Sequence, residues 1–219
     1  MGVGLAKGVR WRDSPDMSES SPKTVIPRPA ASLLVVDRAG PTLKLLMGMR
    51  GAGHKFMPNR LVFPGGAVDP EDHAARHATP PRPDVLKRLE KSAEPALARA
   101  LVHAAARELE EETGLSLGSP PALDGIDYLC RAVTPEGSPM RFDARFLVVD
   151  ATRISGTLGG SDELENLRWY GLDEANAMDL AIPQRKVIEK LVSWLELPEA
   201  ERRAIGTVDV LHNRLWVTE

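Results

Sequence analysis

Continuous apolar runs in the first third of the chain predict a region built from strands. The runs ASLLVVD (31–37) and LKLLMGM (43–49) flank the segment RAGPT, whose glycine and proline favour a turn. A shorter apolar run follows in NRLVFPGG (59–66), which ends in two adjacent glycines. We therefore expect two strands joined by a turn, and then a short third strand.

Farther along the chain, apolar residues recur at the spacing of a helix. Pro95 opens ALARALVHAAARELEEET (96–113), which is rich in the helix formers alanine and leucine, and Gly114 suits a left-handed helix end. The segment 182–197 carries an apolar stripe at the same period, which predicts an amphipathic helix. Three more strands are expected between these two helices, at residues 126–133, 141–151 and 163–170.

Strands that are followed by alternating helices and strands indicate an α/β fold, in which helices flank a mixed β-sheet. Residues 1–27 are rich in serine, proline, glycine and charge, and this composition predicts a flexible N-terminal arm. Residues 28–219 would then form one domain, which is long enough to bury a sizeable core. Within it, residues 73–95 are polar and proline-bearing, with a short helical candidate at 85–91.

Composition and charge exclude several classes of protein. The net charge is −3, with 27% charged and 42% hydrophobic residues, so no broad nucleic-acid or membrane surface is expected. Cys130 is the only cysteine, which excludes an intrachain disulfide and favours a reducing compartment. No apolar run approaches the roughly 20 residues of a membrane span, and the N-terminus lacks an apolar signal core. We expect a cytoplasmic protein that binds neither nucleic acid nor membrane.

The end of the long predicted helix concentrates negative charge in the stretch RELEEETGL (107–115). Glu108, Glu111 and Glu112 share one face of this helix, because residues three and four apart lie side by side. Each carboxylate near the negative end of the helix dipole costs about 0.3–1 kcal/mol. A bare run of this kind is most often a solvated acidic helix end. Clustered carboxylates are also what Mg²⁺ and Mn²⁺ prefer, and the upstream glycine pair would let a backbone carbonyl approach a metal.

These residues carry a resemblance to a known family. The stretch 107–115 matches the second half of the Nudix box, REUxEExGU with U aliphatic, at every fixed position. The first half of the box is a glycine, five residues and a glutamate, and here Gly66 is followed after five residues by Asp72. The box has seven residues between this acid and the arginine, whereas this chain has 34, so 27 are extra. The sequence thus resembles a Nudix hydrolase with an insertion, at about residues 73–95, inside its signature.

The resemblance covers roughly residues 28–197 and implies the Nudix α/β/α sandwich with a mixed β-sheet. It also implies metal-dependent hydrolysis of a nucleoside diphosphate linked to another group, and hence a small-molecule nucleotide substrate. By matching position, the catalytic Mg²⁺ or Mn²⁺ would be bound by Glu108, Glu111, Glu112 and the carbonyl of Gly66.

Two further side chains receive roles from the resemblance. Arg107 would pair with a neighbouring carboxylate and so fix the orientation of the glutamates, and the shorter acid Asp72 is the departure that bears on this pairing. Glu165 stands four residues before Trp169, where many members of the family carry an acid that binds metal or acts as the general base. Glu163 is the alternate for this position, and Glu108 or Glu112 are alternates for the general base. An exposed strand edge is the other interpretation of the segment.

An insertion at this point resembles one branch of the family, the coenzyme A diphosphatases related to the mammalian peroxisomal enzyme. That branch carries an arginine, a second arginine five residues on, a glycine four further, and then FPGG. Here Arg50, Lys55, Asn59 and the FPGG stretch that begins at Phe63 fall at those spacings, with two identities changed. Arg50 and Lys55 could hold phosphate oxygens, with Phe63 and Gly65 beside them, although Lys55 could equally be a solubilising surface cation.

The sequence leaves three questions open. The substrate could instead be ADP-ribose, a dinucleoside polyphosphate or another nucleotide sugar. A protein of a different class, a catalytically silent Nudix domain that senses a ligand, would not need to retain the costly glutamates. The insertion could form a lid over the pocket or a homodimer interface, and its proline-rich flanks indicate a surface excursion.

Overall fold

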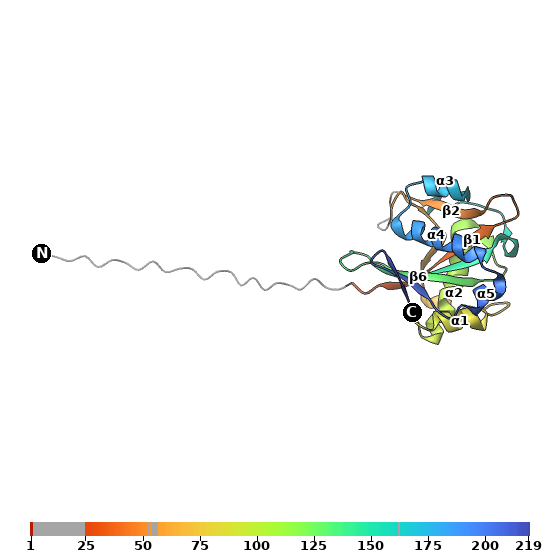
Figure 1. Cartoon of the computed structure of the whole chain (residues 1–219), viewed down its shortest axis with the longest axis horizontal. Coiled ribbons are helices and arrows are strands. Elements are labelled where there is room, and N and C mark those ends of the chain that lie inside the picture. Colours follow the sequence, from red (N-terminus) through yellow and green to blue (C-terminus); the bar gives the residue numbers. More distant parts are fainter. Residues whose placement is uncertain (2–24, 52, 54–56, 162) are drawn as a thin grey trace.

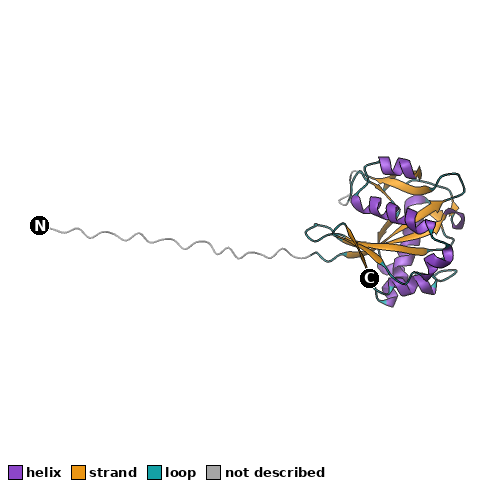
Figure 2. Cartoon of the chain, viewed as in Figure 1, coloured by secondary structure: helices purple, strands orange, loops and turns teal. Residues whose placement is uncertain are grey.

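The chain folds into a sheet with helices on both faces (Figure 1). The structure is a computed structural model that describes residues 1, 25–51, 53, 57–161 and 163–219. The predicted arm at residues 1–27 therefore lies almost entirely outside the described residues. Two layers of helices cover the sheet (Figure 2), with α1 (Pro83–Leu89) and α2 (Pro95–Thr113) on one face and α3 (Leu172–Ala177) and α4 (Ile182–Glu196) on the other. This is the α/β sandwich that the sequence predicts.

In the described part of the chain, the central sheet has the strand order β11-β10-β6-β7-β1-β2-β3, with β4 paired to β1 and β9 paired to β2. The pairs β1–β7 and β6–β10 are parallel and the others are antiparallel, so the sheet is mixed, as expected. A separate small sheet joins β5 and β8. The strands span Arg28–Asp37 (β1), Lys44–Arg50 (β2), Leu61–Val62 (β3), Gly65–Ala67 (β4), Leu115–Ser116 (β5), Asp127–Val133 (β6), Phe142–Asp150 (β7), Ser155–Gly156 (β8), Leu164–Gly171 (β9), Asp209–His212 (β10) and Leu215–Thr218 (β11).

Strand β1 runs through the middle of the sheet and is buried on both faces. Leu33 and Val35 join the core formed with α2, whereas Leu34 and Val36 join the core under α4. Because neither face of the strand meets water, ASLLVVD is a continuous apolar run without alternation. Both strands expected at the start of the chain are present, as β1 and β2.

The two long predicted helices are present with boundaries close to those expected. Helix α2 starts at Pro95 and ends at Thr113, and Gly114 follows with a φ of 70° in the left-handed region, as predicted. Helix α4 begins at Ile182, and its apolar stripe is buried against the sheet. Shorter helical segments are η1 (Pro70–His73), η2 (Ala151–Arg153) and α5 (Glu199–Ala204). None of the helices in the described residues has the length and apolar character needed to cross a membrane.

The insertion belongs to the core, so the expectation of a surface excursion is corrected. Val85 and Leu89 of α1 are 1% and 0% exposed and pack in the same core as α2. Arg88 is buried beside them, and its guanidinium donates to the carbonyl of Tyr128 and, at 3.1 Å, to that of Thr207. A buried charge of this kind requires such partners, which fix α1 to the sheet. No residue of α1 lines the large pocket described below, so α1 is not a lid over it.

A C-terminal hairpin extends the sheet beyond the last helix. Strand β10 pairs in parallel with β6 and antiparallel with β11. The turn residues Asn213 and Arg214 have φ values of 48° and 69°, and two left-handed residues are what a tight hairpin turn of type I′ requires. Two short runs rich in valine, leucine and tryptophan flank the polar residues HNR in VDVLHNRLWV (208–217), and they are the signal for this hairpin, which the sequence prediction did not include.

Replacement of Leu89 by alanine tests whether the insertion stabilises the domain. Because Leu89 is fully buried, Leu89→Ala should lower the free energy of unfolding by roughly 2–5 kcal/mol, measured by urea denaturation. Lys87→Ala on the same helix removes an exposed side chain and should change that free energy by less than about 0.5 kcal/mol. Equally small effects of both substitutions would show that α1 contributes nothing to the core.

Candidate active site

Arg107, near the end of α2, is held by a two-point ion pair with Asp72. Its Nε lies 3.0 Å from Asp72 Oδ1, and its Nη2 lies 3.1 Å from Asp72 Oδ2. Nη2 also donates to the carbonyl of Ala67 at 3.1 Å. Burial opposes the charge of Arg107, but the hydrogen bond to Asp72 and the charge of Glu108 outweigh it and raise the guanidinium pKa above its ordinary value.

Asp72 reaches Arg107 from η1, far upstream in the sequence. Its side chain is 2% exposed, and Oδ2 accepts a hydrogen bond from the backbone N–H of Asp69 at 2.8 Å. The hydrogen bond within η1 therefore fixes the orientation of the carboxylate independently of Arg107. The pairing expected for Arg107 exists in this structure with an acid one carbon shorter than glutamate, and the two-point contact sets the plane of the guanidinium.

The remaining nitrogen of Arg107, Nη1, faces the acidic helix end. It lies 3.0 Å from Glu108 Oε1 and 3.0 Å from Glu111 Oε2. Glu112 turns to the strand side, where it accepts a hydrogen bond from the backbone N–H of Gly65 at 2.8 Å. The three glutamates of the shared helix face are thus held by one arginine and one backbone amide.

Two of these glutamates are removed from water. Glu112 is 3% exposed, and burial raises its pKa to about 8, against the opposing effects of its backbone hydrogen bond and the charge of Arg50. Burial also raises the pKa of Glu108, although Arg107 acts to lower it. A Cβ added at Gly66 would collide with the Glu108 carboxylate in its present position, so glycine lets this carboxylate lie directly against β4. The result is a dense group of carboxylates for which the ionised form is costly.

The donor set suits a divalent cation, but the carboxylates do not converge in this conformation. Within the described residues, no three His, Cys, Asp or Glu side chains are grouped closely enough to hold a metal ion. Glu111 is the side chain that would have to move, because it is 59% exposed and lies on Arg107. Carboxylate and carbonyl oxygens fit Mg²⁺ or Mn²⁺, and a cation would offset the buried charges. Metal binding by Glu108, Glu111, Glu112 and the Gly66 carbonyl stays a prediction.

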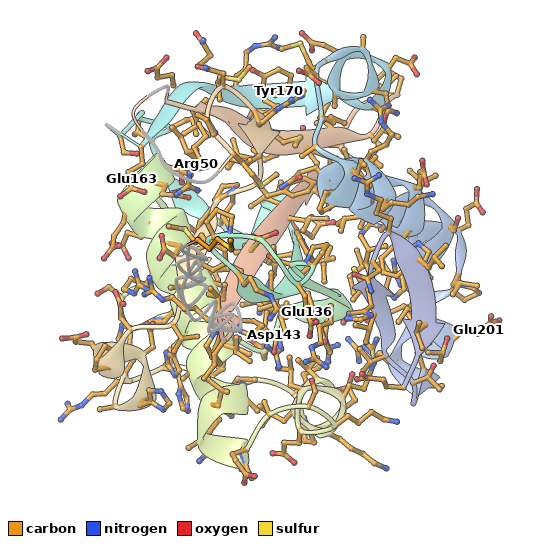
Figure 3. All side chains as sticks on the ribbon, turned by 90° about the vertical axis from the view of Figure 1, so that its left-hand side faces the viewer. Arg50, Glu136, Asp143, Glu163, Tyr170 and Glu201 are labelled. Carbon is orange, nitrogen blue, oxygen red and sulfur yellow. The ribbon has the colours of Figure 1, made fainter. Side chains whose placement is uncertain are left out.

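A pocket of about 850 Å³ opens beside this cluster. Figure 3 shows Arg50, at the end of β2, close to Glu163, just before β9, and both lie near the end of α2. Among the described residues, Glu165 is exposed outside the pocket lining, and the buried Glu112 does not line it either. The predicted site residues that line the pocket are Arg50, Phe63, Gly65, Gly66, Arg107, Glu108, Glu111 and the alternate Glu163.

Pairing between β2 and β9 separates the two candidate acids before Trp169. Arg50 is the register partner of Leu164, which is 1% exposed, and the N–H of Gly51 donates to the carbonyl of Glu163 at 3.4 Å. This pairing sets Glu163 beside the pocket. Its charge contributes to the raised pKa of both buried glutamates, so it faces the acidic cluster.

Arg50 is half-buried and incompletely hydrogen-bonded. Its Nε is buried and has no hydrogen-bond partner among the described residues. A guanidinium in this state suits an anionic ligand that can accept its hydrogen bonds. Lys55, which was expected to act with Arg50, lies outside the described residues.

The far wall of the pocket comes from segments that the sequence did not single out. Residues 181–184, at the start of α4, line it, and so do Arg28 of β1 and Arg214 of the C-terminal turn. The apolar stripe of α4 predicts packing only and carries no signal for its first turn. The two arginines lie outside the motifs, so only the fold brings them to this wall.

The pKa of Glu112 predicts how stability depends on pH without metal. In the folded state the buried carboxyl has a pKa of about 8, whereas the ordinary pKa of a glutamate, taken here for the unfolded chain, is 4.5. Its contribution to stability is therefore full at low pH and is lost as the pH rises from 4.5 through 8. In EDTA, the unfolding free energy of the wild type should fall relative to that of Glu112→Gln by about 3 kcal/mol between pH 5 and 8, measured by urea denaturation. Parallel curves would contradict the raised pKa.

Comparison with known proteins gives a consistent assignment. The family model described as the NUDIX domain matches residues 98–191. A NUDIX hydrolase from Alicyclobacillus acidocaldarius has a similar crystal structure, with a TM-score of 0.58 and 24% identity, covering 77% of this chain and 92% of that chain. The NUDIX domain of Shewanella oneidensis NrtR, solved in complex with ADP ribose, has a TM-score of 0.52 and 18% identity, covering 81% of this chain and 94% of that chain.

A curated relative adds a local match. "Putative nudix hydrolase 7" of Caenorhabditis elegans is 49% identical over 45 residues, which is 20% of this chain and 15% of that relative. The chain thus matches only a small part of that protein's length. The family model covers most of α2, the helix that carries the acidic cluster, and the two solved structures cover 77% and 81% of this chain. From this agreement we conclude that residues 98–191 match the NUDIX domain, in a chain whose fold is similar to that of solved NUDIX hydrolases.

Proposed function

We propose that this chain is a metal-dependent pyrophosphohydrolase that cleaves the diphosphate linkage of coenzyme A or an acyl-coenzyme A. The products would be 3′,5′-ADP and 4′-phosphopantetheine or its acyl form. The observation that carries the proposal is one continuous pocket, whose wall contains Arg50 together with Glu108 and Glu111 of the acidic cluster. A pyrophosphate needs both kinds of group, because its oxygens accept hydrogen bonds from cationic donors and its hydrolysis requires carboxylates.

The size and charge of the pocket support a substrate with several phosphates. Its volume of about 850 Å³ falls within the roughly 300–1,000 Å³ of small-molecule sites. Arg28, Arg50 and Arg214 all line it, so cationic groups are available at more than one place along its wall. Coenzyme A carries a 3′-phosphate in addition to its pyrophosphate. Arg50 also stands at the position of an arginine in the signature of the coenzyme A branch.

ADP-ribose is the main competing substrate. The Shewanella domain binds ADP ribose in its solved structure, but at 18% identity this likeness concerns the fold alone. The competing hypothesis from another functional class is a catalytically silent domain that senses a ligand. Retention of Glu108 and Glu112 in a buried place where ionisation is costly supports an enzyme over a sensor.

Each group of pocket residues would have a separate role in the proposed reaction. Mg²⁺ or Mn²⁺, bound by the glutamates and the Gly66 carbonyl, would supply the positive charge that offsets the phosphate oxygens and acidifies water. Arg50 would hold phosphate oxygens, while Arg107 positions Glu108 and Glu111. Glu163 is the preferred general base, because it lines the pocket and faces the acidic cluster. It would accept the proton of the attacking water.

Product analysis with a panel of substrates tests the proposed function. The protein is incubated with coenzyme A, acetyl-coenzyme A, ADP-ribose and diadenosine polyphosphates in Mg²⁺ or Mn²⁺, and products are identified by mass spectrometry. We expect 3′,5′-ADP and phosphopantetheine from the first two. Glu111→Gln should reduce turnover at least about 100-fold, because it removes an expected metal ligand.

Glu110→Gln is the matched control for this substitution. Glu110 lies on the same helix turn but outside the pocket lining, so its removal should leave turnover near the wild-type rate. Cleavage of ADP-ribose alone would discard coenzyme A and keep the hydrolase. No cleavage of any substrate would favour the sensor, and near-normal activity of Glu111→Gln would refute the metal-site assignment.

A pair of substitutions on the β9 segment distinguishes the two candidate bases. Glu163→Gln should lower kcat by roughly 100- to 10,000-fold, with the low-pH limb of the rate profile removed, as expected for loss of a general base. Glu165→Gln should leave kcat nearly unchanged, because this side chain lies outside the pocket lining in the described structure. The reverse result would assign the role to Glu165.

A further inference from the structure

The first turn of α4 forms part of the pocket wall and places uncapped backbone N–H groups there. Helix α4 begins after Ala181 without a side-chain cap, and residues 181–184 all line the pocket. Pro183 has no N–H, so the amides of Ile182 and Gln184 are the donors that this helix start leaves without partners inside the helix. A helix start of this kind does not by itself define a ligand, and the side chain of Gln184 supplies the second observation.

Gln184 is a buried amide whose polar atoms are not satisfied by the described residues. The residue is 7% exposed, and its Oε1 is buried with no hydrogen-bond partner among the described residues. Its Nε2 reaches only the sulfur of Met57, at 4.0 Å, and a thioether is a weak acceptor. Buried polar groups are nearly always paired, so an unpaired one on a pocket wall suggests a missing partner. The terminal torsion of glutamine is broad, which lets either amide atom turn toward a ligand.

The surroundings of Gln184 restrict the kind of partner. The neighbouring pocket wall is apolar, and it includes Phe63 and Phe146, whose rings meet edge to face with centroids 6.5 Å apart. Ala132 and Leu211 line the same pocket. A phosphate would satisfy Nε2 but has no donor for Oε1. The amide instead matches a neutral, flat group that presents an N–H donor beside an acceptor, as glutamine does when it pairs with adenine.

We propose that Gln184 and the uncapped first turn of α4 form the subsite for such a neutral donor–acceptor edge of the substrate. The inference rests on the proposed function, which places the phosphates at the opposite wall. Coenzyme A offers this edge on its aminopurine base, and the trans amides of its pantetheine arm offer a donor and an acceptor on opposite sides. Gln184 then determines specificity at the end of the pocket away from the reacting phosphorus.

Binding in EDTA tests the subsite apart from catalysis. Calorimetry compares AMP, purine riboside 5′-monophosphate (which lacks the amino group) and 4′-phosphopantetheine on wild type and Gln184→Met. The methionine keeps the side-chain length and removes both polar atoms. AMP or phosphopantetheine should bind the variant about 5- to 100-fold more weakly. If the base is the source, AMP loses its advantage over the purine analogue, and if the arm is the source, only phosphopantetheine is affected.

Thermal stability separates a binding role from a structural one. Loss of an unsatisfied buried amide should leave the Tm of Gln184→Met unchanged or raise it by roughly 2–4 °C. Tyr128→Phe is the matched control, since its hydroxyl is also buried without a partner among the described residues but lies outside the pocket lining. It should leave binding of every probe unchanged.

Three results would overturn the subsite: unchanged binding to Gln184→Met, a lower Tm for this variant, or no binding of any probe to the wild type. The proposed function is judged separately, by hydrolysis in Mg²⁺. Hydrolysis by the wild type with an unchanged KM in Gln184→Met would reject the subsite alone. Absence of hydrolysis together with AMP binding that depends on Gln184 would reject the proposed function alone.

Discussion

The buried ion pair between Arg107 and Asp72 connects the acidic end of α2 to the turn that follows β4, and the arrangement of the site depends on it. With two of its nitrogens fixed by Asp72, the arginine has one left, Nη1, for Glu108 and Glu111. Removal of Arg107 would leave the carboxylate of Asp72, which is 2% exposed, without its ion-pair partner. The glutamates would then lose both their orientation and their nearest positive charge.

This dependence on a contact in space explains how the signature tolerates an insertion. Arg107 and Asp72 are 35 positions apart in the sequence, but the pair needs only their meeting across α2 and η1. The intervening chain folds as α1 and the first turns of α2, and buries Val85 and Leu89 in the same core. The inserted residues therefore enlarge the domain on the face of the sheet that carries α2, while the pocket extends away from α1.

Sequence patterns identified the parts of this fold that depend on local chemistry. Apolar runs located β1 and β2, and Pro95 and Gly114 marked the two ends of α2. The box gave the acidic residues, because their spacing is a property of one helix. Patterns could not choose between Glu163 and Glu165, since that choice depends on how β9 pairs with β2 across an irregularity in register. The positions of Arg28, Gln184 and Arg214 in the pocket wall could not be predicted either, because each reaches the pocket only through long-range packing.

Glu111 lies on a guanidinium that already neutralises part of the cluster, and this has a consequence for ion exchange. Arg107 acts as an internal counterion to Glu108 and Glu111, so part of the negative charge of these carboxylates is offset by the protein itself. A cation that binds Glu111 competes with Nη1 of Arg107 for this carboxylate. The free energy of cation binding is therefore less favourable than for a carboxylate without an ion-pair partner. Phosphate oxygens from a substrate would add ligands and shift this competition toward the cation. If the proposed metal and substrate bind here, occupancy by one would then favour occupancy by the other.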